Sequence, residues 1–236
     1  MVPVRFRFVV LLLTVAVVSS GCGNSNPGGS EDESPDGLWV RGYYANFVDE
    51  SRVAVASCSV DVRMGDSDGE AVSDLTVSCN GEELFYSQGV YTSDLTDVAP
   101  GGDVVFVISN ARDEYTGVVV VPDPPTGLQL AEGSWDFDDP SGSHTLTWDC
   151  AATVADSIMV FLVGTGPHSW NVVAYTKYVP CAATELTIQN SNLPDGFSVS
   201  TELEAGVLQV DTGALDMGTG DSRIWARCGP FAWWDL

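Results

Sequence analysis

Short runs rich in β-branched residues, separated by Gly, Asp, Asn and Pro, most constrain what this chain can fold into. Four of these runs lie in the first half of the chain, at 53–62, 74–79, 103–108 and 117–121. Several of them alternate with the period of two that is typical of strands. After residue 37, no stretch keeps the apolar spacing of three, four and seven that an amphipathic helix requires. The pattern predicts an all-β fold.

Turn residues divide this fold. Asn80-Gly81 predicts a tight hairpin, because both central residues of a type I′ turn need positive φ. Residues 122–127 contain three prolines, which disfavour helix and central strand, and predict a stiff junction between a domain at 38–121 and a domain at 128–236. Strands of the second domain are expected at 145–148, 157–163, 171–178, 185–189, 197–203, 207–210 and 223–227. Strands at this regular spacing favour a sandwich.

Three motifs of the second half resemble fibronectin type III modules. They are a proline-led first strand at 124–128, a tryptophan on the second strand at 144–148, and a leucine-proline turn at 193–197. Phe197 stands where that family has tyrosine, and the segment 204–222 is longer than usual. Residues 95–107 echo the leucine-proline turn in the first half. The resemblance implies two related immunoglobulin-like β-sandwiches.

The N-terminus has the three parts of a secretory signal. Arg5 and Arg7 precede an apolar run at 8–18, which is too short to span a bilayer, and small residues follow it. The end, Val-Ser-Ser-Gly before Cys22, resembles the lipobox of bacterial lipoproteins, although serine occupies the usual aliphatic position. The resemblance implies that residues 1–21 are removed and that Cys22 carries lipid. An ordinary cleaved signal and an uncleaved anchor are the alternatives.

This resemblance implies that the protein is located in the cell envelope and that its lipid anchor binds it to the membrane. Gly23 implies the outer membrane if the source is Gram-negative. Residues 22–37 comprise the lipidated cysteine and a polar, acidic segment that cannot bury enough apolar surface to fold. We expect this tether to be disordered, with a root-mean-square reach of about 20 Å.

The charge balance excludes several partners. The chain has 33 acidic and 9 basic residues, and removal of the signal leaves seven basic residues and a net charge of −26. A phosphate backbone needs basic neutralisation, so nucleic acid is excluded, as is adhesion to anionic headgroups through charge. A cation, a basic partner, or acidity that serves only solubility or a saline habitat remain open.

Lipidation of Cys22 leaves five of the six cysteines. Cys58 and Cys79 lie on consecutive expected strands and should bond, closing a loop whose cross-link is worth about 3 kcal/mol. The fibronectin-like topology implies that Cys150 lies near Cys181, which leaves Cys228 over. A bond between Cys181 and Cys228 is the competing arrangement. The close Cys and His spacing of a metal site is missing.

Catalysis finds little support in the sequence. The two histidines, His144 and His168, belong to no recognisable nucleophile or metal motif. With so many carboxylates, chance pairs are expected everywhere. The sequence therefore predicts a protein that is not an enzyme and has no cofactor beyond an optional structural calcium. Calcium prefers oxygen ligands on short turns, and solvated acidic turns explain the same residues equally well. The candidate calcium ligands are Asp66, Asp68 and Glu70 on one turn and Asp136, Asp138 and Asp139 on another.

Aromatic side chains are the other functional resource. Trp170, Tyr175 and Tyr178 lie on or beside one expected hairpin and would suit a sugar, whereas alternation assigns Trp148 and Trp225 to the core. The sequence thus predicts a noncatalytic cell-envelope lipoprotein with a structural or interaction role and an unidentified protein or glycan partner. The alternative is a carbohydrate or surface-polymer binding module assisted by calcium.

Overall fold

The computed structural model describes ten stretches of the chain, and the signal segment, Cys22, the tether, His168 and Trp170 lie outside them. The described residues are 37–48, 54–95, 97–111, 113–130, 136–139, 141–150, 155–166, 172–200, 202–216 and 222–235. Within these stretches no helix is long and apolar enough to cross a membrane.

The regular structure is almost entirely β, which confirms the predicted fold class. Two 3-10 turns, η2 (Asn190–Asn192) and η3 (Phe197–Val199), precede β14. The strands are β1 (Leu38–Val48), β2 (Ala54–Met64), β3 (Thr76–Cys79), β4 (Glu82–Glu83), β5 (Phe85–Ser87), β6 (Val90–Leu95), β7 (Asp103–Ser109), β8 (Glu114–Val120), β9 (Thr126–Leu130), β10 (Ser143–Asp149), β11 (Ser157–Thr165), β12 (Val172–Pro180), β13 (Glu185–Gln189), β14 (Glu202–Leu215) and β15 (Arg223–Asp235).

Both halves pair their strands in the same order. In the first half β1, β2 and β6 are neighbours, as are β4, β3, β7 and β8; in the second half β9, β10 and β13 are neighbours, as are β12, β11, β14 and β15. The tight turn predicted at Asn80-Gly81 joins β3 to β4, and both of its residues have positive φ. Each half is therefore an immunoglobulin-like sandwich of two sheets.

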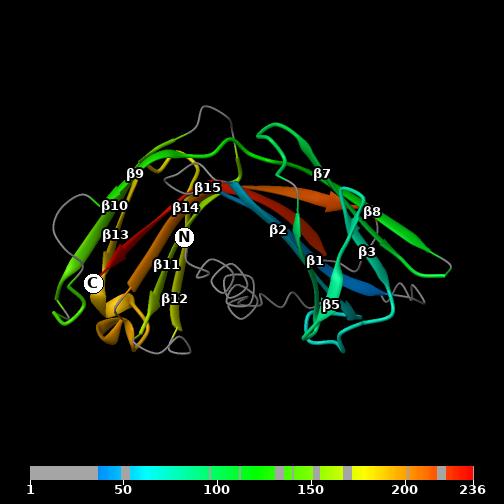
Figure 1. The fold of residues 1–236 in the computed structure, drawn as a ribbon, viewed down its shortest axis with the longest axis horizontal. Coiled ribbons are helices and arrows are strands. Elements are labelled where there is room, and N and C mark those ends of the chain that lie inside the picture. Colours follow the sequence, from blue (N-terminus) through cyan, green and yellow to red (C-terminus); the bar gives the residue numbers. More distant parts are fainter. Residues whose placement is uncertain are drawn as a thin grey trace, which may run out of the picture.

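The last two strands belong to both halves, and residues 128–236 are therefore not a self-contained sandwich. β15 pairs in parallel with β1 from Arg41 and Arg223 to Val48 and Pro230. The end of β14 pairs with β8, while its beginning pairs with β11. In Figure 1 this hairpin runs across the top of an arch from one arm to the other. The predicted junction at 122–127 runs from the end of β8 into the start of β9, while the hairpin of β14 and β15 joins the two halves.

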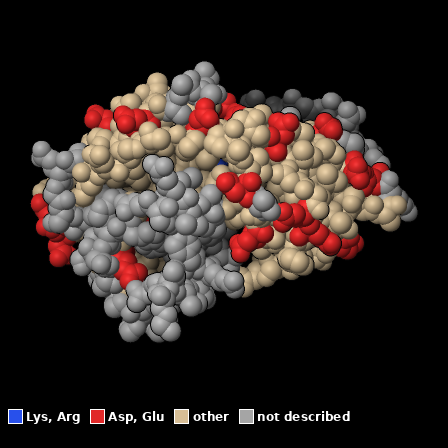
Figure 2. Space-filling model, turned by 45° about the horizontal axis from the view of Figure 1, so that its top comes forward, with Lys and Arg blue, Asp and Glu red and all other residues tan. Residues whose placement is uncertain are grey.

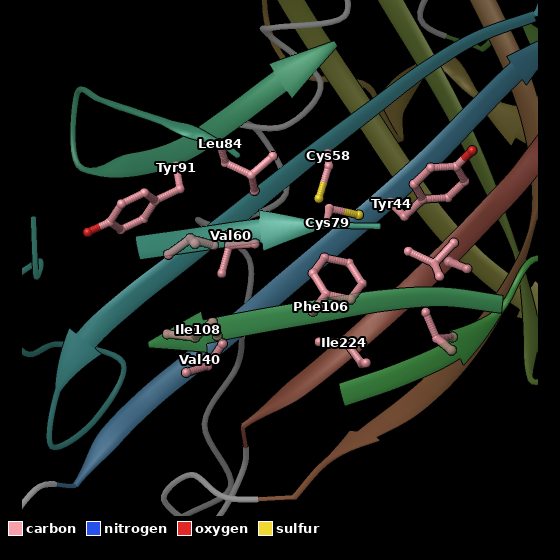
Figure 3. Packing of buried hydrophobic residues seen from close by; sticks show 14 of the residues in the cluster. Val40, Tyr44, Cys58, Val60, Cys79, Leu84, Tyr91, Phe106, Ile108 and Ile224 are labelled. Carbon is pink, nitrogen blue, oxygen red and sulfur yellow. The ribbon is translucent and has the colours of Figure 1, made fainter. Parts of the chain in front are cut away.

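All strands except β9, β10 and β13 belong to one long sheet of twelve strands, and the first and second cores lie on the same side of it. The first core is closed by β1, β2, β6 and β15 on one side and β3, β7 and β8 on the other, and Figure 3 shows its packing around Phe106. Gly42 lets Phe106 approach β1, because a Cβ there would lie 3.1 Å from the ring. The second core lies between β11 and β14 and the sheet of β9, β10 and β13. Leu203, Ala205 and Val207 of β14 face the second core, while Ile224, Ala226 and Cys228 of β15 face the first.

The C-terminal strands are longer than the sequence predicted. The expected strands at 197–203 and 207–210 are one strand, β14, which begins only at Glu202 because residues 197–199 form a 3-10 turn. The extra length of the segment 204–222 extends β14 to Leu215. This length allows the hairpin to reach the first half.

Candidate functional site

The opposite side of the long sheet forms the candidate site. We call the concave face the side of β12, β11, β14, β15, β1 and β2 that faces away from the first and second cores; it is the inner side of the arch in Figure 1. Because side chains alternate along a strand, the residues paired across these strands share one face. Tyr43 of β1 and Trp225 of β15 are paired in this way.

A third core of apolar side chains covers one end of the concave face, and all its members come from this one sheet. Phe47 of β1 lies edge-on to Phe161 of β11, with ring centroids 6.3 Å apart, although β15 and β14 separate their strands. The sheet is bent toward this side, so the large side chains meet. The third core consists of Ala45, Phe47, Met159, Phe161, Val163, Leu208, Val210 and Phe231, with Val172, Ala174 and Trp225 at its margin.

Aromatic rings and guanidinium groups occupy the other end. Tyr43 and Trp225 are stacked, with centroids 4.9 Å apart and 12° between the planes. The Arg227 guanidinium carbon lies 4.6 Å from the centroid of the Tyr43 ring, and Nη2 donates a hydrogen bond of 3.3 Å to the Tyr178 hydroxyl. Such cation–π contacts contribute about 0.5–2 kcal/mol, more when the cation is desolvated. Arg227 is only 6% exposed.

Arg41 extends this cluster along β1. Its guanidinium carbon lies 4.6 Å from the centroid of the Trp39 ring, and its side chain hydrogen-bonds to Tyr43. Burial raises the pKa of Tyr43, and the charges of Arg227 and Arg41 only partly offset that effect. Tyr43 is therefore a neutral phenol at physiological pH.

Glu204 is a buried carboxyl on the same face. It is 4% exposed, and burial raises its pKa from 4.5 to about 8. It is paired with Val163 of β11, beside the third core. At neutral pH the side chain is mostly protonated.

The predicted aromatic binding set does not form one platform within the described residues. Tyr175 packs against the second core, while Tyr178 lies on the concave face and is 47% exposed. The two are three residues apart on β12, and alternation therefore puts them on opposite faces. Trp170 lies outside the described residues. Trp148 is buried in the second core as predicted, whereas Trp225 lies on the concave face.

The predicted calcium ligands cap their own turns. The Asp66 carboxylate accepts the Asp68 amide at 3.0 Å, and the Asp136 carboxylate accepts the Asp138 amide at 3.1 Å. Asp139 accepts the amide and the hydroxyl of Ser141. These bonds lower the pKa of Asp139. Glu70 is exposed, and its carbonyl accepts the Met64 amide. In the described ranges no three His, Cys, Asp or Glu side chains group as metal ligands would.

The five described cysteines are thiols in this structure. Cys58 and Cys79 lie side by side in the first core (Figure 3), and burial, followed by the hydrogen bond between them, raises the pKa of Cys58. The Cys150 Sγ lies 3.1 Å from the Cys181 carbonyl oxygen. Cys228 is buried in the first core, which raises the pKa of its thiol to about 12. The geometry thus brings Cys150, and not Cys228, to Cys181. The two disulfides stay predictions.

His144 lies in a structural setting. It is buried on β10 with its ring 5.1 Å from that of Phe137, and its pKa is lowered chiefly by burial. A hydrogen bond to Asn190 opposes that shift. His144 is therefore neutral at physiological pH and packed against an aromatic ring.

The concave face was not predicted from the sequence, although a signal for it exists there. The two central strands carry alternating patterns, Trp39-x-Arg41-x-Tyr43 and Arg223-x-Trp225-x-Arg227, in a chain with only nine Lys and Arg residues. On the face shown in Figure 2, by contrast, acidic side chains spread over both halves with almost no basic ones among them. Clustered cations in so acidic a chain indicate a site.

The fold defines an all-β protein built of two fused sandwiches. No family model and no curated protein matches the chain. Among solved structures, it is similar to a two-domain fibronectin type III segment of chicken tenascin (13% identity, TM-score 0.29, 76% of this chain and 92% of that one). It is also similar to the FN1–FN3 domains of chicken CNTN1 (10%, 0.26, 74% and 58%) and to the Yersinia pseudotuberculosis adhesin InvE (12%, 0.25, 85% and 61%).

Proposed function

We propose that this chain is a noncatalytic cell-envelope lipoprotein, anchored by lipid on Cys22, that displays its fused sandwiches for structural or interaction roles. One observation supports display in particular. Among the described residues the first strand is β1, which begins at Leu38, immediately after the expected tether, and is an interior strand of its sheet. The membrane anchor would therefore pull directly on β1.

β1 is well suited to such a load. It pairs with β2 along its whole length, from Leu38 and Met64 to Val48 and Ala54, and with β15 on its other side. Val40 is also fixed by a hydrogen bond of 3.0 Å from its amide to the Ser222 hydroxyl. A pull along β1 would shear this strand against β2 and β15. The hydrogen bonds to both neighbouring strands would then have to break together, because both strands run alongside β1.

Fractionation of cells tests the anchor. Wild-type protein should sediment with membranes, be released by detergent and incorporate labelled fatty acid. Cys22→Ala should take up no label, whereas the matched control Cys228→Ala should behave like wild type. Equal labelling of Cys22→Ala, or an unlabelled wild-type protein recovered from the medium, would contradict the proposal.

Glycan binding is the second candidate function, and the exposed ring of Tyr178 supports it. A glycan array, probed with residues 23–236 with and without calcium, should give signals that Tyr178→Ala removes. Phe85→Ala, which removes a ring that is 71% exposed elsewhere, is the control. Absence of binding to every sugar would discard this candidate.

A further inference from the structure

The concave face changes from cationic to apolar along its central strands. On β15, Arg223, Trp225 and Arg227 are followed by Phe231; on β1, Arg41 and Tyr43 are followed by Ala45 and Phe47. The two strands are parallel, so their gradients coincide: Arg41 is paired with Arg223, and Ala45 with Arg227. The apolar end continues onto β11 and β14 as the third core.

The cationic end is unusual for this chain. The structure describes five Lys and Arg side chains, and four of them lie on the concave face. The four are Arg41, Arg63, Arg223 and Arg227, whereas Lys177 lies on the other face of β12. The buried acid at this end, Asp61, is opposite Arg41 in register, but its oxygens accept bonds from the Arg63 Nε at 3.0 and 3.1 Å. The cationic end therefore carries more positive than negative side-chain charge.

Buried donors at this end have no acceptor among the described residues. The Nε atoms of Arg41 and Arg227 and the Ser57 hydroxyl are shielded from solvent and unpartnered there. A buried donor without an acceptor is destabilising, and more so when it is charged. Unpartnered guanidinium nitrogens beside the buried apolar side chains of the third core indicate a ligand that supplies oxygen acceptors and an apolar body.

From the alignment of these groups we infer that the concave face binds an anionic amphiphile. Its carboxylate or phosphate head would lie at Arg41, Arg223 and Arg227, and its aliphatic chain would run along the third core beside Phe47 and Phe161. A neutral lipid would leave the guanidinium groups unmatched. An acidic polymer without an apolar body would leave the third core unused. This inference goes beyond the proposed anchor, because it assigns a ligand to a particular face.

Titration with a fatty acid tests the inference. Residues 23–236, which include every residue that the structure describes, are titrated with laurate below its micelle threshold, and binding is followed by tryptophan fluorescence. Dodecanol, with the same chain and a neutral head, should bind at least tenfold more weakly. Arg227→Gln should weaken laurate binding about tenfold or more, because charge-assisted hydrogen bonds are lost. Lys177→Gln, a matched loss of charge on the opposite face, should bind like wild type.

Three results would overturn the inference: no laurate binding, equal binding of laurate and dodecanol, or wild-type affinity in a folded Arg227→Gln protein. If Arg227→Gln does not fold, the exposed Arg223→Gln replaces it with the same expectation. A dimer on gel filtration that laurate fails to dissociate would mean that a second copy covers this face, and would also overturn the inference. None of these results bears on the lipid anchor at Cys22, which fractionation tests separately.

Discussion

Replacing Glu204 by glutamine should make the protein more stable, and by an amount that depends on pH. The folded protein holds this carboxyl with a pKa of about 8, against an ordinary value of 4.5. Each pKa unit of difference between folded and unfolded states is worth about 1.4 kcal/mol, so the whole gap amounts to about 5 kcal/mol. Below pH 4.5 Glu204 is protonated in both the folded and the unfolded protein, so the difference between its two pKa values has no effect on the free energy of unfolding.

The sign follows from proton binding. Between pH 4.5 and 8 the unfolded state loses the proton while the folded state keeps it, so the free energy of unfolding of the wild type falls as pH rises. Above pH 8 the loss is complete. Glutamine resembles the protonated acid and does not titrate. Glu204→Gln should therefore match the wild type near pH 4 and exceed it by up to about 5 kcal/mol at pH 8.

Urea unfolding at half-unit steps from pH 4 to 9 measures this difference. Glu185→Gln, which removes an exposed carboxylate from β13, serves as the control for the loss of one negative charge. A difference between Glu204→Gln and wild type that stays constant across the range would refute the reasoning. It would mean that Glu204 is solvated in the folded protein.

The remaining predictions concern cross-links, packing and calcium. In protein purified from cells without reductant, mass spectrometry before and after reduction should find Cys58 bonded to Cys79, and reduction should lower the free energy of unfolding by about 3 kcal/mol; a full count of alkylated thiols without reduction would contradict this. Gly206→Ala should cost about 1–3 kcal/mol by urea unfolding, because its Cβ would overlap the buried Phe161 ring; an unchanged midpoint would show that the ring can move. Calcium should leave the calorimetric melting temperature unchanged, since Asp66 and Asp136 already cap their turns; a rise with calcium would restore the metal-site hypothesis.

The sequence predicted the elements whose signals are local. Strands β2, β7 and β8 have one face toward the first core and alternate accordingly, and Asn80-Gly81 identified its own hairpin. β1 alternates less clearly, because its residues contribute to the first core on one face and to the third on the other. The pairing of β1 with β15 joins residues more than 180 positions apart in the sequence. A pattern within one strand cannot predict which distant strand will be its neighbour.

The site was less predictable, for the same reason. Tyr43, Trp225 and Arg227 become neighbours only when β15 lies beside β1, and Tyr178 joins them only because the sheet bends. Alternation alone assigned Trp225 to the core, since one strand pattern cannot tell which of two sheet faces is enclosed. The concentration of arginine on two strands could be seen in the sequence, but its meaning required the pairing.

The parallel ladder between β1 and β15 also dictates an order of assembly. The N-terminal sandwich cannot be completed until the last thirteen-residue strand of the chain has emerged, since that strand supplies Ile224, Ala226 and Cys228 to its interior. Until then β1 offers an unsatisfied edge to any neighbouring polypeptide. Such long-range pairing makes folding slow, so this chain should depend on protection by chaperones while it folds.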